Sequence, residues 1–219
     1  MRLDAWEVSF QYAPVGPVGG DYCDLIPRKT GELLLFFGDV MGKGFAASKI
    51  SSQLNGVMRT LLYFDVPFEA LAEHGNRIFC ERVEAVGYYA TFICACATPS
   101  GTIDLINAGH LPPLLIRQNG TERVMATGVP IGLFQGSTYE TTRLHLAPGE
   151  TLLFYTDGVT EARDASDREY GHERLERLAA SHRHVSPTEL VQACRNDVSV
   201  FASGRKMSDD VTVLALRRI

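Results

Sequence analysis

The stretch YATFICACATPSGTIDLIN, residues 89–107, shows what kind of sheet this chain builds. Two runs rich in strand-forming residues, Ala90 to Thr98 and Thr102 to Asn107, are separated by the turn-forming pair Ser100-Gly101. A connection this short joins antiparallel strands, because parallel strands need a crossover of about a dozen residues or more. The sequence therefore predicts a β-hairpin here.

Outside this hairpin, strand patterns continue to residue 155 and occur near both ends of the chain. We predict further strands over residues 6–12, 22–26, 33–40, 114–117, 121–125, 138–146, 151–155 and 211–216, with turns at Asn119-Gly120 and Pro148-Gly149. Helices are predicted over 45–64, from Pro67, over 173–181, and from the capping box Ser186-Pro187-Thr188-Glu189. Two helices, a long antiparallel block, two more helices and a final strand favour an α+β sandwich with helices on its outer faces.

Length and composition indicate one ordinary globular domain, residues 1–219. The net charge of -5 argues against a nucleic-acid partner, which needs a basic face. The sequence contains no signal peptide and no apolar run of about 18 residues, so we expect no membrane partner. Five cysteines without framework spacing favour a reduced, cytoplasmic location. Cys94 and Cys96 alternate within an apolar strand, which predicts core packing rather than metal binding.

Aspartates stand at several predicted strand ends, most of them beside glycine. They are Asp21 in GGDYCD, Asp39 in GDVMGKG, Asp157 in YTDGVTE, and the pair Asp209-Asp210 in SDDVTV. Strand ends present functional groups at a surface, and glycine permits a ligand to approach closely. Gathered carboxylates repel one another unless a cation neutralises them, and oxygen ligands select hard cations such as Mg²⁺ or Mn²⁺. Taken singly, each aspartate is explained as readily by the preference of this residue for turns.

A known family shares these motifs. The ordered set VGGDYCD, FFGDVMGKG, YATF, NAGHLPPLLI, GVPIGL, LLFYTDGVTEARD and SDDVTVL resembles the bacterial, SpoIIE/RsbU-like branch of the PPM (PP2C-type) serine/threonine phosphatases. The resemblance runs from about residue 6 to residue 217. It implies a four-layer αββα sandwich, two central antiparallel sheets flanked by helices, with two Mn²⁺ or Mg²⁺ ions at one end.

The resemblance also implies the ligands. Asp39 would bridge the two metals, the carbonyl of Val40 would add a further ligand, and Asp21, Asp157 and Asp209 would each help to hold a metal.

The roles of other motif residues are less defined. Asp210 and Asp24 would support the ligands from behind or bind a weaker third metal, and Lys43 is a candidate contact for phosphate. Met41 stands where the eukaryotic branch has a histidine proposed as the general acid, so no acid is assigned. We expect His110 to fix the loop after its strand by hydrogen bonds, rather than to act as a base.

The reaction implied is direct attack of a metal-activated water on phosphoserine or phosphothreonine, without a phosphoenzyme. Consistent with this, no arginine lies six residues after any cysteine, as the cysteine phosphatases require. The implied substrate is a small regulatory protein, a STAS-type anti-sigma-factor antagonist. Relatives usually carry an N-terminal regulatory region, so we expect this chain to be a catalytic domain that lacks one, and the missing segment to be a route to a homodimer.

The sequence leaves one other function open and argues against two more. The alternative that stays open is a catalytically weak or inactive PPM domain that acts as a regulatory protein-binding module. A metal-dependent nuclease is disfavoured by the acidic net charge. A P-loop nucleotide site is excluded by spacing, because three residues instead of four separate Gly38 from Gly42-Lys43, and Gly44 replaces the required hydroxyl residue.

Overall fold

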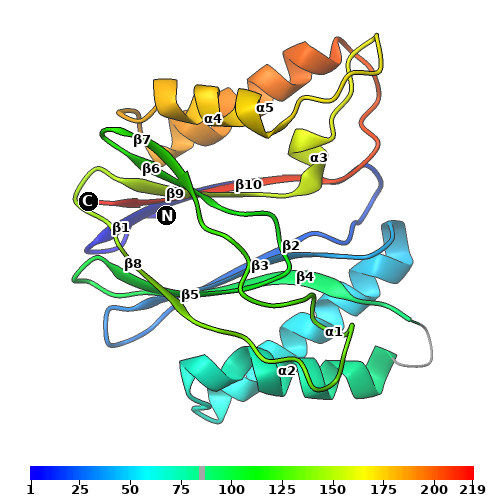
Figure 1. Cartoon of the computed structure of the whole chain (residues 1–219), viewed down its shortest axis with the longest axis vertical. Helices are drawn as coiled ribbons and strands as arrows, with labels where there is room; N and C mark the ends of the chain where they lie inside the picture. Colours follow the sequence, from blue (N-terminus) through cyan, green and yellow to red (C-terminus); the bar gives the residue numbers. More distant parts are fainter. Residues whose placement is uncertain (84–86) are drawn as a thin grey trace.

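The computed structural model describes residues 1–83 and 87–219 of the chain. Two five-stranded antiparallel sheets pack face to face, and helices cover both outer faces (Figure 1). The first sheet has the order β1 (Trp6–Ala13), β10 (Val211–Arg218), β9 (Thr151–Tyr155), β6 (Leu114–Arg117), β7 (Gly120–Arg123). The second has the order β2 (Tyr22–Pro27), β3 (Leu33–Val40), β4 (Ala90–Ala97), β5 (Thr102–Ala108), β8 (Thr142–His145). The predicted αββα sandwich is confirmed.

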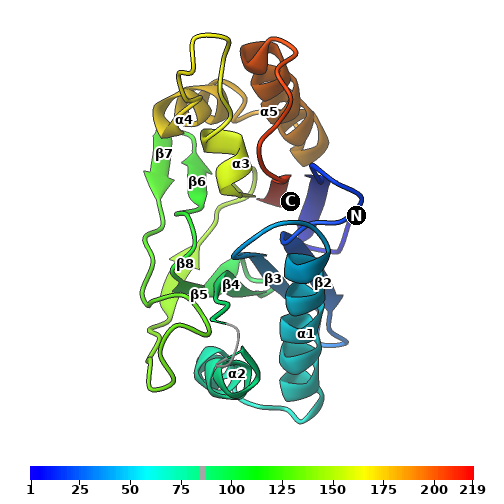
Figure 2. The same ribbon diagram turned by 90° about the vertical axis from the view of Figure 1, so that its right-hand side faces the viewer.

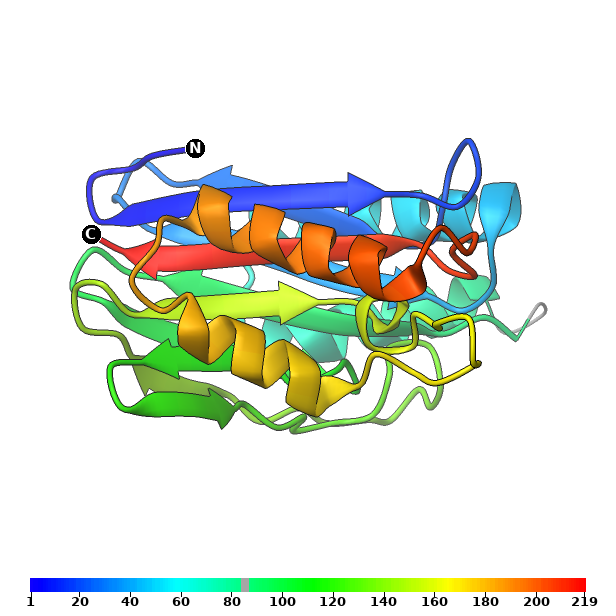
Figure 3. The same ribbon diagram turned by 90° about the horizontal axis from the view of Figure 1, so that it is seen from above.

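Two pairs of helices form the outer layers. Helices α1 (Gly44–Tyr63) and α2 (Phe68–Val83) cover the second sheet, and α4 (His172–Ser181) and α5 (Pro187–Ala202) cover the first (Figures 1 and 3). Helix α5 begins with the predicted capping box, in which Ser186 and Glu189 satisfy each other's backbone N–H groups. Among the residues that the structure describes, no helix is long and apolar enough to cross a membrane.

Alternation along the strands creates three apolar layers between the four structural layers. In β3, Leu33, Leu35 and Phe37 point into the core between the sheets, whereas Leu34 and Phe36 pack beneath α1 and α2. A strand buried on both faces has to be apolar throughout, which explains the continuous run LLLFF. Cys94 is buried and packs in the layer under α1 and α2, as predicted, with Cys96 against the same layer.

The structure differs from the predicted elements around β8. Only Thr142–His145 of the predicted strand 138–146 is a strand. The loop before it occupies the edge of β5 that a longer β8 would need, because Thr127 N donates to the carbonyl of Asn107 at 3.0 Å. The turn at Pro148-Gly149 then carries the chain from β8 in the second sheet to β9 in the first, so that turn does not close a hairpin.

The topology brings the ends of five strands to one end of the sandwich. Because neighbouring strands are antiparallel, the end of β3 lies beside the starts of β2 and β4, and the end of β9 lies beside the start of β10. A short helix that the sequence did not predict, α3 (Asp157–Thr160), follows β9 directly at this end. Figure 2 looks onto this end of the molecule, with α3 between the two pairs of helices.

Candidate metal centre

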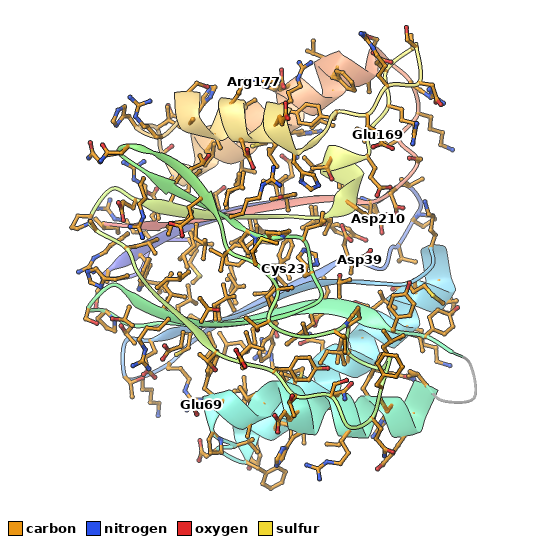
Figure 4. All side chains as sticks on the ribbon, viewed as in Figure 1. Cys23, Asp39, Glu69, Glu169, Arg177 and Asp210 are labelled. Atoms are coloured by element: carbon orange, nitrogen blue, oxygen red, sulfur yellow. The ribbon has the colours of Figure 1, made fainter. Side chains whose placement is uncertain are left out.

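The predicted metal ligands come together at this end from both sheets. Asp39 lies near the end of β3 and Asp21 directly precedes β2, whereas Asp157 opens α3 and Asp209 lies just before β10. The carboxyl groups of Asp21 and Asp39 are close enough to shift each other's pKa, and Asp157 and Asp209 also act on Asp39 electrostatically. In the view of Figure 4, the labels of Asp39 and Asp210 both fall toward this end of the sandwich, Asp39 near the end of β3 and Asp210 directly before β10.

The electrostatics of this cluster oppose its full ionisation. Burial, and then the charges of Asp21 and Asp157, raise the pKa of Asp39 to about 9. Burial is also the largest cause that raises the pKa of Asp21, to about 7. Burial and the nearby charge of Asp209 raise the pKa of Asp157. A divalent cation among these carboxylates would relieve both the repulsion and the desolvation.

The donor atoms are of the kind that a hard divalent cation prefers, but their present positions do not form a coordination site. In the described ranges, no three acidic, histidine or cysteine side chains are placed so that they could hold a metal ion as they stand. The ammonium group of Lys43 lies 2.6 Å from Oδ2 of Asp209, a place that a cation bound by this carboxylate would need. Carboxylate and carbonyl oxygens are nevertheless the ligands that Mg²⁺ and Mn²⁺ prefer. Side chains must therefore reorient, with Lys43 leaving Asp209, before a cation is fully coordinated.

Two threonines that the sequence analysis did not assign hold Asp21. Its Oδ2 accepts hydrogen bonds from Oγ1 of Thr156 at 2.9 Å and from Oγ1 of Thr212 at 2.5 Å, and only 7% of the residue is exposed. Thr156 also accepts a hydrogen bond from the backbone N of Thr212 at 3.0 Å. Thr212 lies on β10 and Thr156 directly follows β9, so the two threonines attach Asp21 to the first sheet, on the opposite side of the sandwich. The available signal was a threonine next to Asp157 in YTDG and three residues after Asp209 in DDVT.

Asp210 differs from its neighbour Asp209. Its Oδ1 accepts from Val15 N at 2.8 Å and its Oδ2 from Gly20 N at 2.9 Å. The carboxylate is buried and ties the glycine-rich loop between β1 and β2 to the start of β10. A Cβ atom on Gly158 would lie 1.9 Å from the carbonyl of Asp210, so the segment after Asp157 also packs closely against it.

Asp24 lies on β2 with its carboxylate engaged by a helix. Its two oxygens accept from Nε and Nη2 of Arg59 on α1, both at 2.5 Å. Asp24 thus ties β2 to α1 and directs both oxygens to an arginine.

The last residue of β3 brings a backbone carbonyl to the same site. A Cβ atom on Gly20 would lie 2.7 Å from the carbonyl oxygen of Val40 and 3.0 Å from Oδ1 of Asp39. Only glycine allows this approach, and the carbonyl of Val40 is therefore beside the candidate bridging carboxylate. Met41 is partly exposed next to it, and its thioether has no proton to donate.

His110 is held within the protein as a neutral side chain. Its backbone N donates to Oδ1 of Asn107 at 2.8 Å, and its carbonyl accepts from Nδ2 of the same residue at 3.2 Å. These bonds fix the loop after β5, as predicted. Burial lowers the pKa of His110 to about 4, so at neutral pH the imidazole carries no charge.

Comparison with known proteins agrees with this geometry. The family model for stage II sporulation protein E (SpoIIE) matches residues 29–219. Protein IcfG of Synechocystis sp. is 27% identical over 245 residues, which cover 99% of this chain and 38% of that protein. Phosphoserine phosphatase RsbU of Bacillus subtilis is 24% identical over 217 residues, which cover 98% of this chain and 64% of RsbU. This chain thus spans less than two thirds of the length of either relative.

A solved structure supports the same relationship. The RsbU and RsbW domains of Rv1364c from Mycobacterium tuberculosis superpose with a TM-score of 0.78 at 26% identity, and the match covers 99% of this chain and 60% of that one.

Proposed function

This chain belongs to the SpoIIE family of bacterial PPM (PP2C-type) phosphatases, and on that premise we propose that it hydrolyses phosphoserine or phosphothreonine in a protein, with divalent metal ions as cofactors. The observation that carries the proposal is the convergence of Asp21, Asp39, Asp157 and Asp209 at one end of the sandwich. Carboxylates that raise one another's pKa at a shared site are typical of a functional centre.

The residues present suit two Mn²⁺ or Mg²⁺ ions. Asp39 would lie between the ions, with Asp21, Asp157, Asp209 and the carbonyl of Val40 completing the oxygen ligands. Such a pair of ions supplies an activated water and neutralises the charge that develops on the transferring phosphoryl group.

The chain's own residues position the reacting groups. Thr156 and Thr212 hold Oδ2 of Asp21, so its other oxygen is the one free to turn toward a cation. Lys43, released from Asp209, would place its ammonium group beside the phosphate. Met41 has no proton to give to the leaving alkoxide, so it is not the general acid. Water is the remaining proton source that we name.

We further propose that the substrate is a small phosphorylated regulator of the STAS type. Two observations support this choice: RsbU is a phosphoserine phosphatase by name, and the Rv1364c structure contains an RsbU domain together with an RsbW domain. A homodimer formed through an additional N-terminal segment stays a prediction.

A second candidate function is a regulatory binding module with little or no activity. The contact between Lys43 and Asp209 favours it, because the ammonium group satisfies a carboxylate that a metal would otherwise need.

Hydrolysis of p-nitrophenyl phosphate in Mn²⁺ separates the two functions. We expect Mn²⁺-dependent activity in the wild type and a loss of more than about 100-fold in Asp39→Asn, since even groups that merely support metal ligands are worth about 10–100-fold. Asp39→Asn puts a neutral amide of the same size in place of a carboxyl whose pKa is raised to about 9, so its folding should not suffer. Asp104→Asn, at the surface ion pair with Arg143, is the matched control. Absence of activity with both Mn²⁺ and Mg²⁺, or equal activity in Asp39→Asn, would refute the phosphatase proposal.

A further inference from the structure

Two side chains connect the backbone of Asp39 in the second sheet to the backbone of Tyr155 in the first. Thr91, on β4, is the direct cross-strand partner of Asp39, and its Oγ1 lies 3.3 Å from the carbonyl oxygen of Asp39. The same Oγ1 lies 2.7 Å from Nδ1 of His110. On the other side of the imidazole, Nε2 lies 3.1 Å from the carbonyl oxygen of Tyr155. We refer to this connection as the Thr91–His110 link.

The chemistry of the partners fixes the protons in this link. A carbonyl oxygen only accepts, so the contact with Tyr155 requires the proton on Nε2 of His110. Nδ1 of His110 is then an acceptor, and the hydroxyl of Thr91 donates to it. The same hydroxyl hydrogen is shared with the carbonyl oxygen of Asp39, which is the more distant of the two acceptors. His110 is 4% exposed and its ring packs edge-on against Phe37, so the imidazole has little freedom to turn.

The link ends next to two groups of the candidate metal centre. The carbonyl of Tyr155 precedes Thr156, which holds Asp21, and lies two residues before Asp157. The other end of the link lies on Asp39 itself. The segment bearing Asp157 follows a strand of the first sheet, and Asp39 lies on a strand of the second. The apolar contacts between the sheets are not directional, so they fix this separation less sharply than hydrogen bonds do, and the bonds from Thr156 and Thr212 act on Asp21 rather than on Asp39. Directional hydrogen bonds across the gap set a defined separation.

We propose that Thr91 and His110 are positioning residues that set the separation between Asp39 and Asp157, so that two divalent ions can be held at once. The inference rests on the proposed metal-dependent phosphatase function. It gives NAGH, in the loop after β5, a role at the metal centre without direct contact with metal or substrate.

Substitutions at Thr91 test the link with little change of shape. Thr91→Val replaces the hydroxyl with a methyl group of similar size, whereas Thr91→Ser retains the hydroxyl. The control is Thr142→Val, a strand threonine on β8 at the far edge of the same sheet. His110→Gln tests the other half of the link, and thermal unfolding in EDTA checks that each variant is folded.

Calorimetric titration with Mn²⁺ is the main measurement, and the electron paramagnetic resonance signal of an exchange-coupled Mn²⁺ pair is the second. We expect the wild type, Thr91→Ser and Thr142→Val to bind two ions and to show the coupled signal. In Thr91→Val and His110→Gln, affinity for at least one ion should fall about 10–100-fold, as is usual when a group behind a metal ligand is removed. The coupled signal should weaken with it.

Two results would overturn the inference while leaving the phosphatase proposal intact. One is Mn²⁺ binding and a coupled signal in both Thr91→Val and His110→Gln that equal those of the wild type. The other is a loss in Thr91→Ser as large as in Thr91→Val, since the hydroxyl would then not be the cause. A wild-type protein that binds no Mn²⁺ refutes the metal-dependent function itself, and the inference falls with it.

Discussion

The neighbouring residues Asp209 and Asp210 should respond in opposite ways to the same substitution. Asp210 is 7% exposed and accepts hydrogen bonds from two backbone N–H groups, the buried one of Gly20 and that of the more exposed Val15. The side chain of Asp209, by contrast, is 31% exposed and contacts the half-exposed Lys43. Changing each to asparagine removes one charge and turns one acceptor oxygen into a donor. The geometry therefore predicts a loss of stability at Asp210 and a loss of metal binding at Asp209.

The expected magnitude follows from the contacts of Asp210. Asparagine retains one acceptor, so one hydrogen bond to a charged group is lost, worth about 1.5–3 kcal/mol. The charge of Asp210 also raises the pKa of Asp21 by repulsion, and its removal returns part of that cost. The net loss is about 1–3 kcal/mol, which lowers Tm by roughly 2–12 °C in a domain of this size. At Asp209, an exposed ion pair contributes at most about 1 kcal/mol.

Thermal unfolding of both variants in EDTA, followed by Mn²⁺ titration, measures the two effects separately. Asp210→Asn should melt early and still bind Mn²⁺ within about tenfold of the wild type, whereas Asp209→Asn should melt normally and lose more than about tenfold in Mn²⁺ affinity. The reasoning is refuted if Asp210→Asn melts with the wild type and fails to bind Mn²⁺, because Asp210 would then be the ligand and its hydrogen bonds to the loop of little consequence.

Three further perturbations follow from the same contacts. Because burial and repulsion raise the pKa of Asp21 to about 7 and that of Asp39 to about 9, from 3.8, the metal-free folded state retains protons that the unfolded state releases. Its Tm should therefore fall as pH rises from about 4 to about 9, and Mn²⁺ should raise Tm more at pH 8 than at pH 6; a flat profile in EDTA would contradict this. Gly20→Ala should lower both Tm and Mn²⁺ affinity, since the new methyl group would lie 2.7 Å from the carbonyl oxygen of Val40. Gly56→Ala, where the new methyl group enters open space on α1, should instead raise the free energy of unfolding by about 1 kcal/mol in chemical denaturation. Asp24→Asn should cost about 1 kcal/mol or less, through its partly exposed ion pair, and leave the Mn²⁺ titration unchanged; weakened Mn²⁺ binding would identify Asp24 as a ligand.

The secondary structure follows largely from local signals. The capping box at Ser186 forms as predicted, and the apolar run 33–40 is a strand with the predicted bounds. The two failures have non-local causes. Residues 138–141 are not a strand because the loop at Thr127 occupies the edge of β5 first. Helix α3 was not predicted, and its Gly158 packs against the backbone of Asp210, about fifty positions further along the chain.

The candidate ligands could be found from sequence because each lies at or near a strand end, Asp21, Asp39 and Asp157 beside glycine, and because the order of the motifs resembles one family. Sequence could not show which side chains hold those ligands in place. Thr156 and Thr212 donate hydrogen bonds to Asp21 from the opposite side of the sandwich. His110, which follows β5, reaches the carbonyl of Tyr155 at the end of β9. Contacts between sheets leave no spacing pattern in the chain, because their register is set by packing rather than by distance along the sequence.

By itself the sequence determined that the chain folds as helices around antiparallel sheets and that aspartates gather at strand ends, since hydrophobic period, capping and turn chemistry act over a few residues. Only the tertiary structure decided which of those carboxylates remain free for a ligand. Both carboxylate oxygens of Asp210 accept from backbone N–H groups, one of them that of Gly20, and both oxygens of Asp24 accept from Arg59. Within the described residues, the side chain of Asp209 instead contacts the ammonium group of Lys43 and the backbone N–H of Asp210. The physical reason is that a buried carboxylate has to find partners, and those partners are brought by folding from distant parts of the chain.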